Sequence, residues 1–483
     1  MLNFFNSNTN FSRNLSLKVN GNKKKYINQD FILYTMDTSY FSGKLEVYLN
    51  LKGITHCKIS PTLKEVGEIC KQYTGTEQLP LLYDARPKLF SEKKWLRDST
   101  YIIKHLESQY KNTTILPQCE YQKFFMDLFE DFADEYLWRP AMFFRWEPEY
   151  DRTVMANRFT YELANETQSR YWYTPSFLKS SLIGLRQWLL SSYGEGCDTD
   201  EKKQVIVTQY YELLAVMESI LKQSPFLFGN KPTLIDVAFM GPFHRHFSSD
   251  PTPKKIMQEK APYTYAWVAR MLISKLSDMN NVESNFPENG TLPNSWDPLL
   301  ILLKDYFEYY ELNYNAFKNN KKFFDWKNKN QIFTVPVVPY RAWCKEKLVE
   351  TFNKCSESTQ QQIITTLKEK CGNDFDYHKF FSSTIEPICE PECGCEPPFS
   401  LAGNKTGSQL SYKWNPNPIF ISYFLKKGFN FSLKISALSV FLYIGYKNKE
   451  VFTNLIKNLI NFVQNFQLCQ TKNTTFRQRL IFP

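Results

Sequence analysis

The sequence predicts a mixed α/β domain, then an all-α domain, and finally a mostly helical C-terminal extension. Over residues 30–112, short apolar runs of strand length alternate with stretches of helical periodicity. Over residues 118–285, apolar residues recur at helical spacing throughout. A Pro- and Asn-rich break at 287–298 precedes further helical stretches within 296–384. The 483 residues are enough for about two to four domains of ordinary size.

The first domain is predicted to begin with a strand, a helix and a second strand. The first strand is the apolar run Phe31–Thr35. Residues Ser42–Lys52 carry leucines and a tyrosine spaced for one buried helix face, and Gly53 ends this helix. The second strand is Ile54–Ile59. A strand–helix–strand order of this length predicts two parallel strands.

The same domain is predicted to continue with a helix, a hairpin and a third helix. The helix covers about Leu63–Tyr73, and the hairpin joins Gln78–Tyr83 to a short strand at Lys88–Phe90. A third helix begins at Asp98–Ser99 and presents Ile and Leu on one side as far as Tyr110.

The later segments are predicted mainly as helices. In the all-α domain, Thr233 and Asp236 have the spacing of a capping box before an apolar helix. Helices are expected at about 299–318 and 340–371, with a charged, solvated stretch at 318–330 between them. Residues 385–418 are rich in Pro, Glu and Cys and are expected to form a loop, and 419–483 contain an amphipathic helix.

Four local motifs resemble the soluble glutathione transferase family. They lie in order and at suitable spacing along residues 30–280: TSYFSGKLEVYLNLKGI (Thr38–Ile54), QLPLLYD (Gln78–Asp84), RDSTYIIKHLE (Arg97–Glu107) and FLFGNKPTLIDVAFMGP (Phe226–Pro242). The resemblance implies a thioredoxin-like first domain that binds glutathione and a glutathione-transferase-type helical second domain. It also implies glutathione as co-substrate, with no other cofactor and no metal.

A glutathione site must hold two carboxylates and lower the pKa of a thiol. The N-terminus of a helix offers unpaired amides and a partial positive charge. Ser99 could therefore bind the γ-glutamyl carboxylate, and Asp98 the α-amino group. Taken alone, the pair is more typical of ordinary helix capping; the resemblance implies the binding role.

Leu79 and Pro80 are the second candidate pair. A cis bond before Pro80 would turn the backbone groups of Leu79 outward, where they could pair with an extended peptide. For an X-Pro pair taken at random, a trans bond at the start of a strand is the commoner state. The resemblance implies the cis form.

A hydroxyl near the start of the first helix is expected to activate the thiol, because a hydrogen bond to a thiolate favours its charged form. Ser39 matches the serine-type branches of the family, and Tyr40, Ser42 and Tyr34 are competitors. Many relatives have Pro where this chain has Tyr40-Phe41, so the choice of hydroxyl stays open, as does a non-catalytic site. The turn has no Cys, which disfavours thiol–disulfide chemistry.

Three other groups are given structural interpretations. The acidic run Glu130, Asp131, Asp134 and Glu135 is interpreted as a solvated helix face, and His244–His246 as a solvated turn. Cys389, Cys393 and Cys395, with Cys371 and His378 upstream, match no usual zinc spacing and are interpreted as free thiols.

The excess positive charge lies at the two ends of the chain. The net charge is +10, yet residues 1–29 hold five basic residues and no acid, and residues 403–483 hold eleven against Glu450 alone. The part between them is mildly acidic, which disfavours nucleic acid as a partner. The basic leader is as typical of a mitochondrial targeting segment as of a disordered, Asn-rich one. We expect an intracellular protein, mitochondrial or alternatively cytoplasmic.

Two functions follow from these patterns. The first is a glutathione transferase, which would bind glutathione and conjugate its thiolate to an electrophile. The second is a non-catalytic scaffold or accessory subunit of a mitochondrial membrane complex, in the manner of the metaxins, which resemble glutathione transferases. The tail 419–483 would then contact a membrane surface peripherally. A homodimer or a larger complex is expected in either case.

Overall fold

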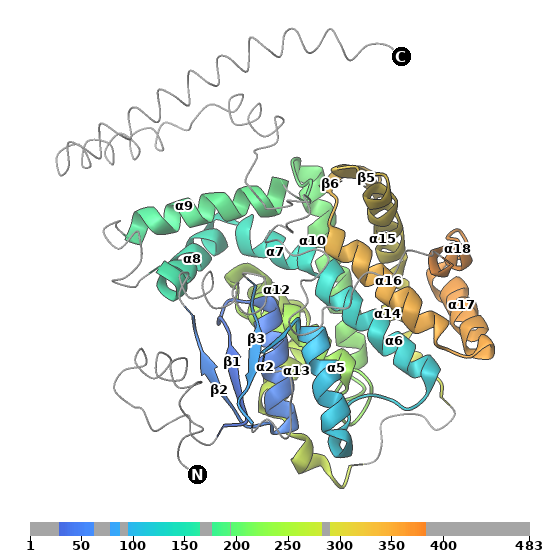
Figure 1. Ribbon diagram of the computed structural model, residues 1–483. Coiled ribbons are helices and arrows are strands. Elements are labelled where there is room, and N and C mark those ends of the chain that lie inside the picture. The colour runs from blue at the N-terminus through green and yellow to red at the C-terminus, as the bar shows by residue number, and fades with distance from the viewer. Residues whose placement is uncertain are drawn as a thin grey trace, which may run out of the picture. The chain divides into compact units, whose positions relative to one another are not determined.

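A computed structural model describes residues 29–61, 78–86, 95–164, 176–193, 195–282 and 290–382. Within these residues, the predicted order of an α/β domain, an all-α domain and a helical extension is confirmed. Figure 1 shows the strands of the first domain on one side of the helices and the two strands of the extension apart from them.

A four-stranded sheet is the centre of the first domain. Its strands lie in the order β2 (His56–Ile59), β1 (Phe31–Tyr34), β3 (Leu81–Asp84), β4 (Trp95–Arg97). As predicted, β1 is parallel to β2, while β3 is antiparallel to both β1 and β4. The partner of β3 is β4 rather than residues 88–90. Those residues and the predicted helix at 63–73 lie outside the described residues.

Helices α2 (Tyr40–Lys52) and α5 (Ser99–Gln109) pack against each other beside the strands (Figure 1). Ser39 caps α2, which therefore begins two residues earlier than predicted. Gly53 ends the helix with φ of 68°, a left-handed conformation that glycine adopts without a Cβ clash. Helix α11 (Leu234–Pro242) packs on α2 and joins the two domains.

The second domain is entirely helical over its described residues, as predicted. Its helices are α6 (Glu120–Asp131), α7 (Trp138–Trp146), α8 (Glu149–Phe159), α9 (Ser176–Trp188), α10 (Asp200–Leu221), α11, α12 (Pro251–Lys260) and α13 (Pro262–Ile273). A π-helical turn, η3 (Phe132–Tyr136), connects α6 to α7. The capping box predicted for Thr233 and Asp236 is present at the start of α11.

The extension contains more than the predicted helices. It is built from α14 (Asp297–Ile301), α15 (Leu303–Lys318), β5 (Phe323–Asn328), β6 (Gln331–Pro336), α16 (Pro339–Asn353), α17 (Glu357–Cys371) and α18 (Tyr377–Phe381). The Lys and Asn residues of the stretch expected to be solvated, 318–330, are exposed except for Asn328. The expectation missed that residues from Phe323 onward form β5, which pairs with β6 in a hairpin. Phe324, Trp326 and Asn328 are buried, while the residues between them are exposed.

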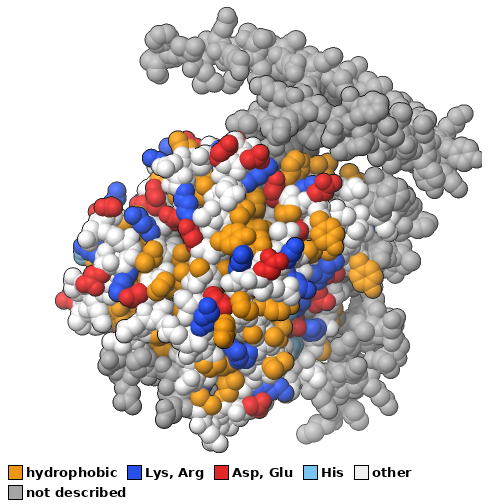
Figure 2. Space-filling model, turned by 180° about the vertical axis from the view of Figure 1, so that it is seen from behind, with side chains coloured by type: hydrophobic (Ala, Val, Ile, Leu, Met, Phe, Trp, Pro, Cys, Tyr) orange, Lys and Arg blue, Asp and Glu red, His pale blue; other side chains and the backbone are white. Residues whose placement is uncertain are grey.

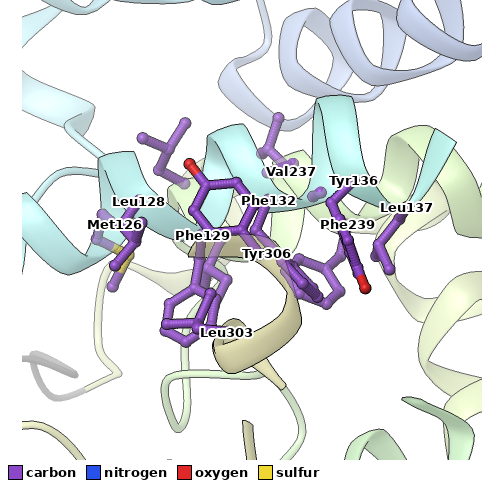
Figure 3. Packing of buried hydrophobic residues seen from close by; sticks show 14 of the residues in the cluster. Met126, Leu128, Phe129, Phe132, Tyr136, Leu137, Val237, Phe239, Leu303 and Tyr306 are labelled. Atoms are coloured by element: carbon purple, nitrogen blue, oxygen red, sulfur yellow. The ribbon is translucent and has the colours of Figure 1, made fainter. Parts of the chain in front are cut away.

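The extension shares one hydrophobic core with the two domains before it. A single cluster of buried side chains runs from Phe31 in β1 to Phe381 in α18. Figure 3 shows part of this cluster, in which Phe132 of η3 lies near Phe239 and Tyr306. The ring centroid of Phe132 is 6.3 Å from that of Phe239 in α11 and 5.9 Å from that of Tyr306 in α15. The extension is therefore part of the core.

The surface of the described part carries charges of both signs. On the face in Figure 2, acidic and basic side chains are interspersed with hydrophobic ones. Among the described helices, none combines the length and the apolar character that a membrane crossing requires.

Candidate functional site

The segments that carry the predicted site residues meet at one edge of the sheet. Tyr34, the last residue of β1, pairs with Leu81, the first residue of β3, and Leu81 pairs in turn with Arg97, the last residue of β4. The loop after β1, the residue pair before β3 and the start of α5 therefore lie together. This arrangement brings the three predicted parts of the site to one place.

Ser39 lies in the loop after β1 and caps helix α2. Its backbone is extended, and its Oγ accepts a hydrogen bond from the Ser42 amide at 3.4 Å. The side chain is half-buried, and among the described residues its hydroxyl has no acceptor. The hydroxyl hydrogen can therefore be donated to a ligand.

The competing hydroxyls are buried. Tyr40 is 2% exposed, its hydroxyl donates to the Ala133 carbonyl, and burial raises its pKa well above the usual value. Tyr34 and Ser42 are at most 1% exposed. Of the four candidate hydroxyls, that of Ser39 is the one accessible in the described structure.

Leu79 and Pro80 lie immediately before β3, and the peptide bond between them is cis. Pro80 is buried, while Leu79 is half-buried and packs near Tyr34 and Trp95. The pair is therefore at the same sheet edge as the cap of α2.

Asp98 adopts a conformation that is rare for a residue with a side chain. Its φ is 68° and its ψ is 116°, which costs about 1–3 kcal/mol and is found most often at binding sites. Its Oδ1 accepts hydrogen bonds from the amides of Thr100 at 3.0 Å and Tyr101 at 3.4 Å. Its Oδ2 accepts one from the hydroxyl of Tyr340 at 2.6 Å. Ordinary helix capping accounts for the two hydrogen bonds to Oδ1 but not for the hydrogen bond from Tyr340 to Oδ2.

Ser99 is the first residue of α5. It is 5% exposed, and the described residues offer no hydrogen-bond partner to its hydroxyl. The N-termini of α2 and α5 both face this edge, and each adds a partial positive charge that favours an anion.

A buried ion cluster lies behind the start of α5. The Lys44 ammonium, which is 0% exposed, lies 2.6 Å from a carboxylate oxygen of Glu130 and 2.5 Å from one of Asp134. The Thr100 hydroxyl lies 3.1 Å from the Lys44 ammonium, 3.0 Å from the Glu130 carboxylate and 3.2 Å from the Asp134 carboxylate. The interpretation of the acidic run as a solvated face is therefore wrong.

The pKa shifts in this cluster follow from two carboxylates sharing one ammonium. Burial lowers the pKa of Lys44, but Asp134 and Glu130 together raise it by more, so the amine stays charged. Burial and the nearby Glu130 raise the pKa of Asp134 to about 7, although Lys44 opposes this. Because its charge is already matched, Lys44 is not the group that would stabilise a thiolate.

The other two acids of the run connect the helical domain to the extension. The Tyr306 hydroxyl of α15 donates to Asp131 at 2.6 Å, and the Arg341 guanidinium of α16 lies 3.1 Å from Glu135. Arg341 also donates to the Tyr309 hydroxyl at 2.5 Å. Each acid of the run thus has a buried partner from a distant segment.

The interpretation of His244–His246 as a solvated turn is also wrong. The segment is π-helical, and Arg245 and His246 are buried. Arg245 binds Glu46 at 2.6 Å and the Asp37 carbonyl at 3.0 Å, which ties the helical domain to α2. A Cβ on Gly43 would lie 2.3 Å from the Arg245 side chain, so the close approach requires glycine there.

No group of ligating side chains suited to a metal ion is found among the described residues. Cys371 is buried and donates to the Leu300 carbonyl at 3.0 Å. Cys389, Cys393 and Cys395 lie outside the described residues.

Sequence reasoning missed Lys44, Thr100 and Tyr340. Lys44 had a detectable signal, since it is a lone charge within an otherwise apolar helix face. Tyr340 had none, because it is 242 positions from Asp98 in the chain.

Two family models match the sequence, one in each of the first two domains. Residues 33–114 match a family model described as glutathione S-transferase, N-terminal domain, and residues 184–274 match glutathione S-transferase, C-terminal domain. No curated protein matches the sequence.

Solved structures with some similarity include a Tau class glutathione S-transferase from mango, Mangifera indica, at 17% identity, 50% of this chain, 88% of that one and a TM-score of 0.31. The beta-etherase LigF from Sphingobium sp. strain SYK-6 is 17% identical. The match covers 53% of this chain and 100% of that one, with a TM-score of 0.36. A glutathione S-transferase from Rhodospirillum rubrum F11 is 13% identical. The match covers 55% of this chain and 97% of that one, with a TM-score of 0.32.

Proposed function

We propose that the chain binds glutathione and conjugates its thiolate to an electrophile, since residues 33–114 and 184–274 match the models of the N-terminal and C-terminal domains of glutathione S-transferases. The observation that carries the proposal is the convergence of Ser39, Leu79–Pro80 and Asp98–Ser99 at one sheet edge, with two helix N-termini facing it. No metal enters the proposal.

Three contacts would hold the peptide. The γ-glutamyl carboxylate would lie at the N-terminus of α5, where the amide and hydroxyl of Ser99 can donate to it. The α-amino group would pair with the carboxylate of Asp98. The main chain of the cysteinyl residue would pair with the backbone of Leu79, as an added strand does.

Ser39 would act on the thiol. A hydroxyl that donates to sulfur stabilises the thiolate more than the thiol and so lowers the pKa of the thiol. The thiol proton would pass to water, and the sulfur lone pair would form the new bond to the electrophilic carbon. With an aryl halide, the carbon–halogen bond would break and halide would leave with the bonding electron pair. Holding both reactants together supplies the rest of the acceleration.

Isothermal titration of the full chain with glutathione tests the binding site. Ser99→Ala is expected to weaken binding about tenfold, because it removes a hydrogen bond to a charged group. Ser108→Ala is the matched control, since Ser108 is an exposed serine at the other end of the same helix. Equal affinities for the two variants would contradict the proposed site.

Ultraviolet titration of the bound thiol tests the role of Ser39. Ser39→Ala is expected to change glutathione affinity little and to raise the pKa of the bound thiol by about one unit or more. Conjugation to an aryl halide should slow accordingly at neutral pH. An unchanged thiol pKa would assign the activation to another group.

A non-catalytic accessory protein on a mitochondrial membrane is the second candidate, and the basic, amphipathic sequence of residues 419–483 motivates it. Cell fractionation with and without these residues tests it. Sedimentation with membranes only when they are present, together with no glutathione binding, would favour this candidate over the enzyme. Light scattering of the purified chain would test the expected homodimer.

A further inference from the structure

Helix α16 brings a side chain into the candidate site from outside both matched domains. The family matches end at residue 274, whereas Tyr340 is in the first turn of α16. Its hydroxyl donates to Oδ2 of Asp98 at 2.6 Å. An O–H···O⁻ hydrogen bond of this length is typical of the stronger, charge-assisted kind.

The first turn of α16 is held firmly in place. The buried side chain of Asn313 donates to the Val338 carbonyl at 3.0 Å and accepts from the Val338 amide at 2.8 Å. Arg341, the residue after Tyr340, is bound to Glu135 and Tyr309. The hydroxyl of Tyr340 is therefore delivered by a rigid segment rather than by a mobile side chain.

The hydrogen bonds to Asp98 leave room for one more donor. A carboxylate has about four lone-pair positions. Two on Oδ1 are taken by the amides of Thr100 and Tyr101, and one on Oδ2 is taken by Tyr340. The remaining position on Oδ2 is available to an ammonium group, and the three donors fix the orientation of the carboxylate.

We propose that Tyr340 is a positioning residue, which holds the Asp98 carboxylate in the orientation that recognises the α-amino group of the γ-glutamyl ligand. This inference rests on the proposed function and adds the extension to the binding site. It makes the selectivity for the amino group, rather than overall affinity, depend on α16.

The test compares two ligands, glutathione and its analogue that lacks the α-amino group, by titration calorimetry on the full chain. The measured quantity is the ratio of the two dissociation constants. Tyr340→Phe is expected to reduce the preference for glutathione about three- to tenfold and to leave the affinity for the analogue unchanged. Tyr121→Phe is the matched control, because it removes a hydroxyl that joins the helical domain to Thr366 of α17 away from the site.

A double-mutant cycle separates positioning from general structural support. In the Asp98→Asn background, Tyr340→Phe is expected to cause no further loss of preference, because it acts through the same carboxylate. Additive losses would overturn the inference. So would an unchanged ratio in Tyr340→Phe, or tighter glutathione binding, which would mean that Tyr340 competes with the amino group.

The two proposals fail in different ways. A wild-type chain that binds neither ligand refutes the proposed function, and the inference falls with it. A wild-type chain that prefers glutathione, with Tyr340→Phe behaving as Tyr121→Phe, refutes the inference alone. Thermal unfolding of each variant, measured in parallel, is expected to show that Tyr340→Phe and Tyr121→Phe remain folded.

Discussion

Asp236 connects three segments of the helical domain through hydrogen bonds of its side chain. Its buried carboxylate accepts hydrogen bonds from the amides of Leu227 at 2.8 Å and Thr233 at 2.9 Å, and from the indole of Trp267 at 3.0 Å. It thus caps α11, fixes the loop before it and anchors α13. The Thr233 hydroxyl also donates to it, at 3.3 Å, so removing the carboxylate would leave the two amides, the indole and this hydroxyl without their acceptor.

Asp236→Ala is expected to lower the free energy of unfolding by about 3–5 kcal/mol, since each unsatisfied buried donor costs about 1–3 kcal/mol. Urea denaturation followed by circular dichroism measures the change. The control is Thr199→Ala, which removes the exposed cap of α10 and should cost only about 1 kcal/mol. Equal losses would show that burial adds nothing to the role of Asp236.

At the scale of single residues, the sequence predicts what local chemistry decides. Asp98 and the box of Thr233 with Asp236 were predicted as caps because capping depends on residues within one turn. Ser39 was singled out through the family resemblance, and its capping of α2 was not predicted. Tyr340 was not, because its position depends on how a distant helix packs.

The turn of the β5–β6 hairpin has an uncommon backbone conformation. Its two-residue turn, Lys329–Asn330, has φ of 44° and 65°. Positive φ at both positions is typical of a type I′ turn, which favours glycine at the second position. The side of the hairpin that faces the core carries Trp326, which is 0% exposed.

Asn330→Gly is expected to raise the free energy of unfolding by about 0.5–1 kcal/mol, because glycine adopts the left-handed conformation without a Cβ clash. Asn330→Ala should lower it by about the same amount. Thermal unfolding of both variants and of the wild type measures the two changes in stability, which are expected to have opposite signs. A change of the same sign in both would exclude backbone conformation as the cause.

At the scale of elements, periodicity predicted the helices, whereas composition alone did not reveal the hairpin. The Lys and Asn residues near 318–330 suggested a solvated stretch, yet Phe324 and Trp326 alternate with exposed positions as a half-buried strand requires. The expected single helix at 340–371 is two helices, α16 and α17, interrupted between Asn353 and Glu357.

For the whole molecule, the ion cluster of Lys44, Glu130 and Asp134 couples stability to pH. The pKa of Asp134 is raised to about 7 by burial, above that of an unfolded aspartate. Between about pH 4 and 7 the folded state therefore holds a proton that the unfolded state has lost. The stabilisation that Asp134 contributes is fully present below that pH range and is lost as the pH rises through 7.

Asp134→Asn removes this titration. The stability of the wild type relative to the variant is expected to fall with rising pH by up to about 1.4 kcal/mol per unit between pH 5 and 7 and to level off above it. Urea unfolding of both proteins at pH 5, 6, 7 and 8 measures the difference. The buried histidines contribute equally to both proteins, so their contribution cancels in the difference in stability. If that difference does not change with pH, the raised pKa of Asp134 is contradicted.

Removal of the extension is expected to unfold the domains before it. A chain that ends at residue 282 lacks Trp296 and Tyr306, which are 0% exposed and pack on Phe129 and Phe132. It should show no cooperative unfolding transition and should aggregate. A chain that ends at residue 382 keeps every described member of the core and serves as the control; a cooperative transition in the shorter chain would refute the shared core.

The sequence predicted the order of the regions but treated the extension as separate. The Pro- and Asn-rich segment at 287–298 is typical of a linker. Contacts between distant residues nevertheless pack the extension onto the domains before it. For example, the Trp296 indole donates to the Leu227 carbonyl at 2.7 Å, although the two residues are 69 positions apart. Such pairs have no local signature.

The shared core also has a consequence during synthesis. The ribosome adds roughly 5–20 residues per second, so the about 100 residues after residue 282 take about 5–20 s to appear. During this time α6 and η3 have already been made, but the apolar surfaces that α15 and α16 cover are still unpaired. The nascent chain therefore passes through a long aggregation-prone interval, and it should need chaperones more than a two-domain chain that can complete its core earlier.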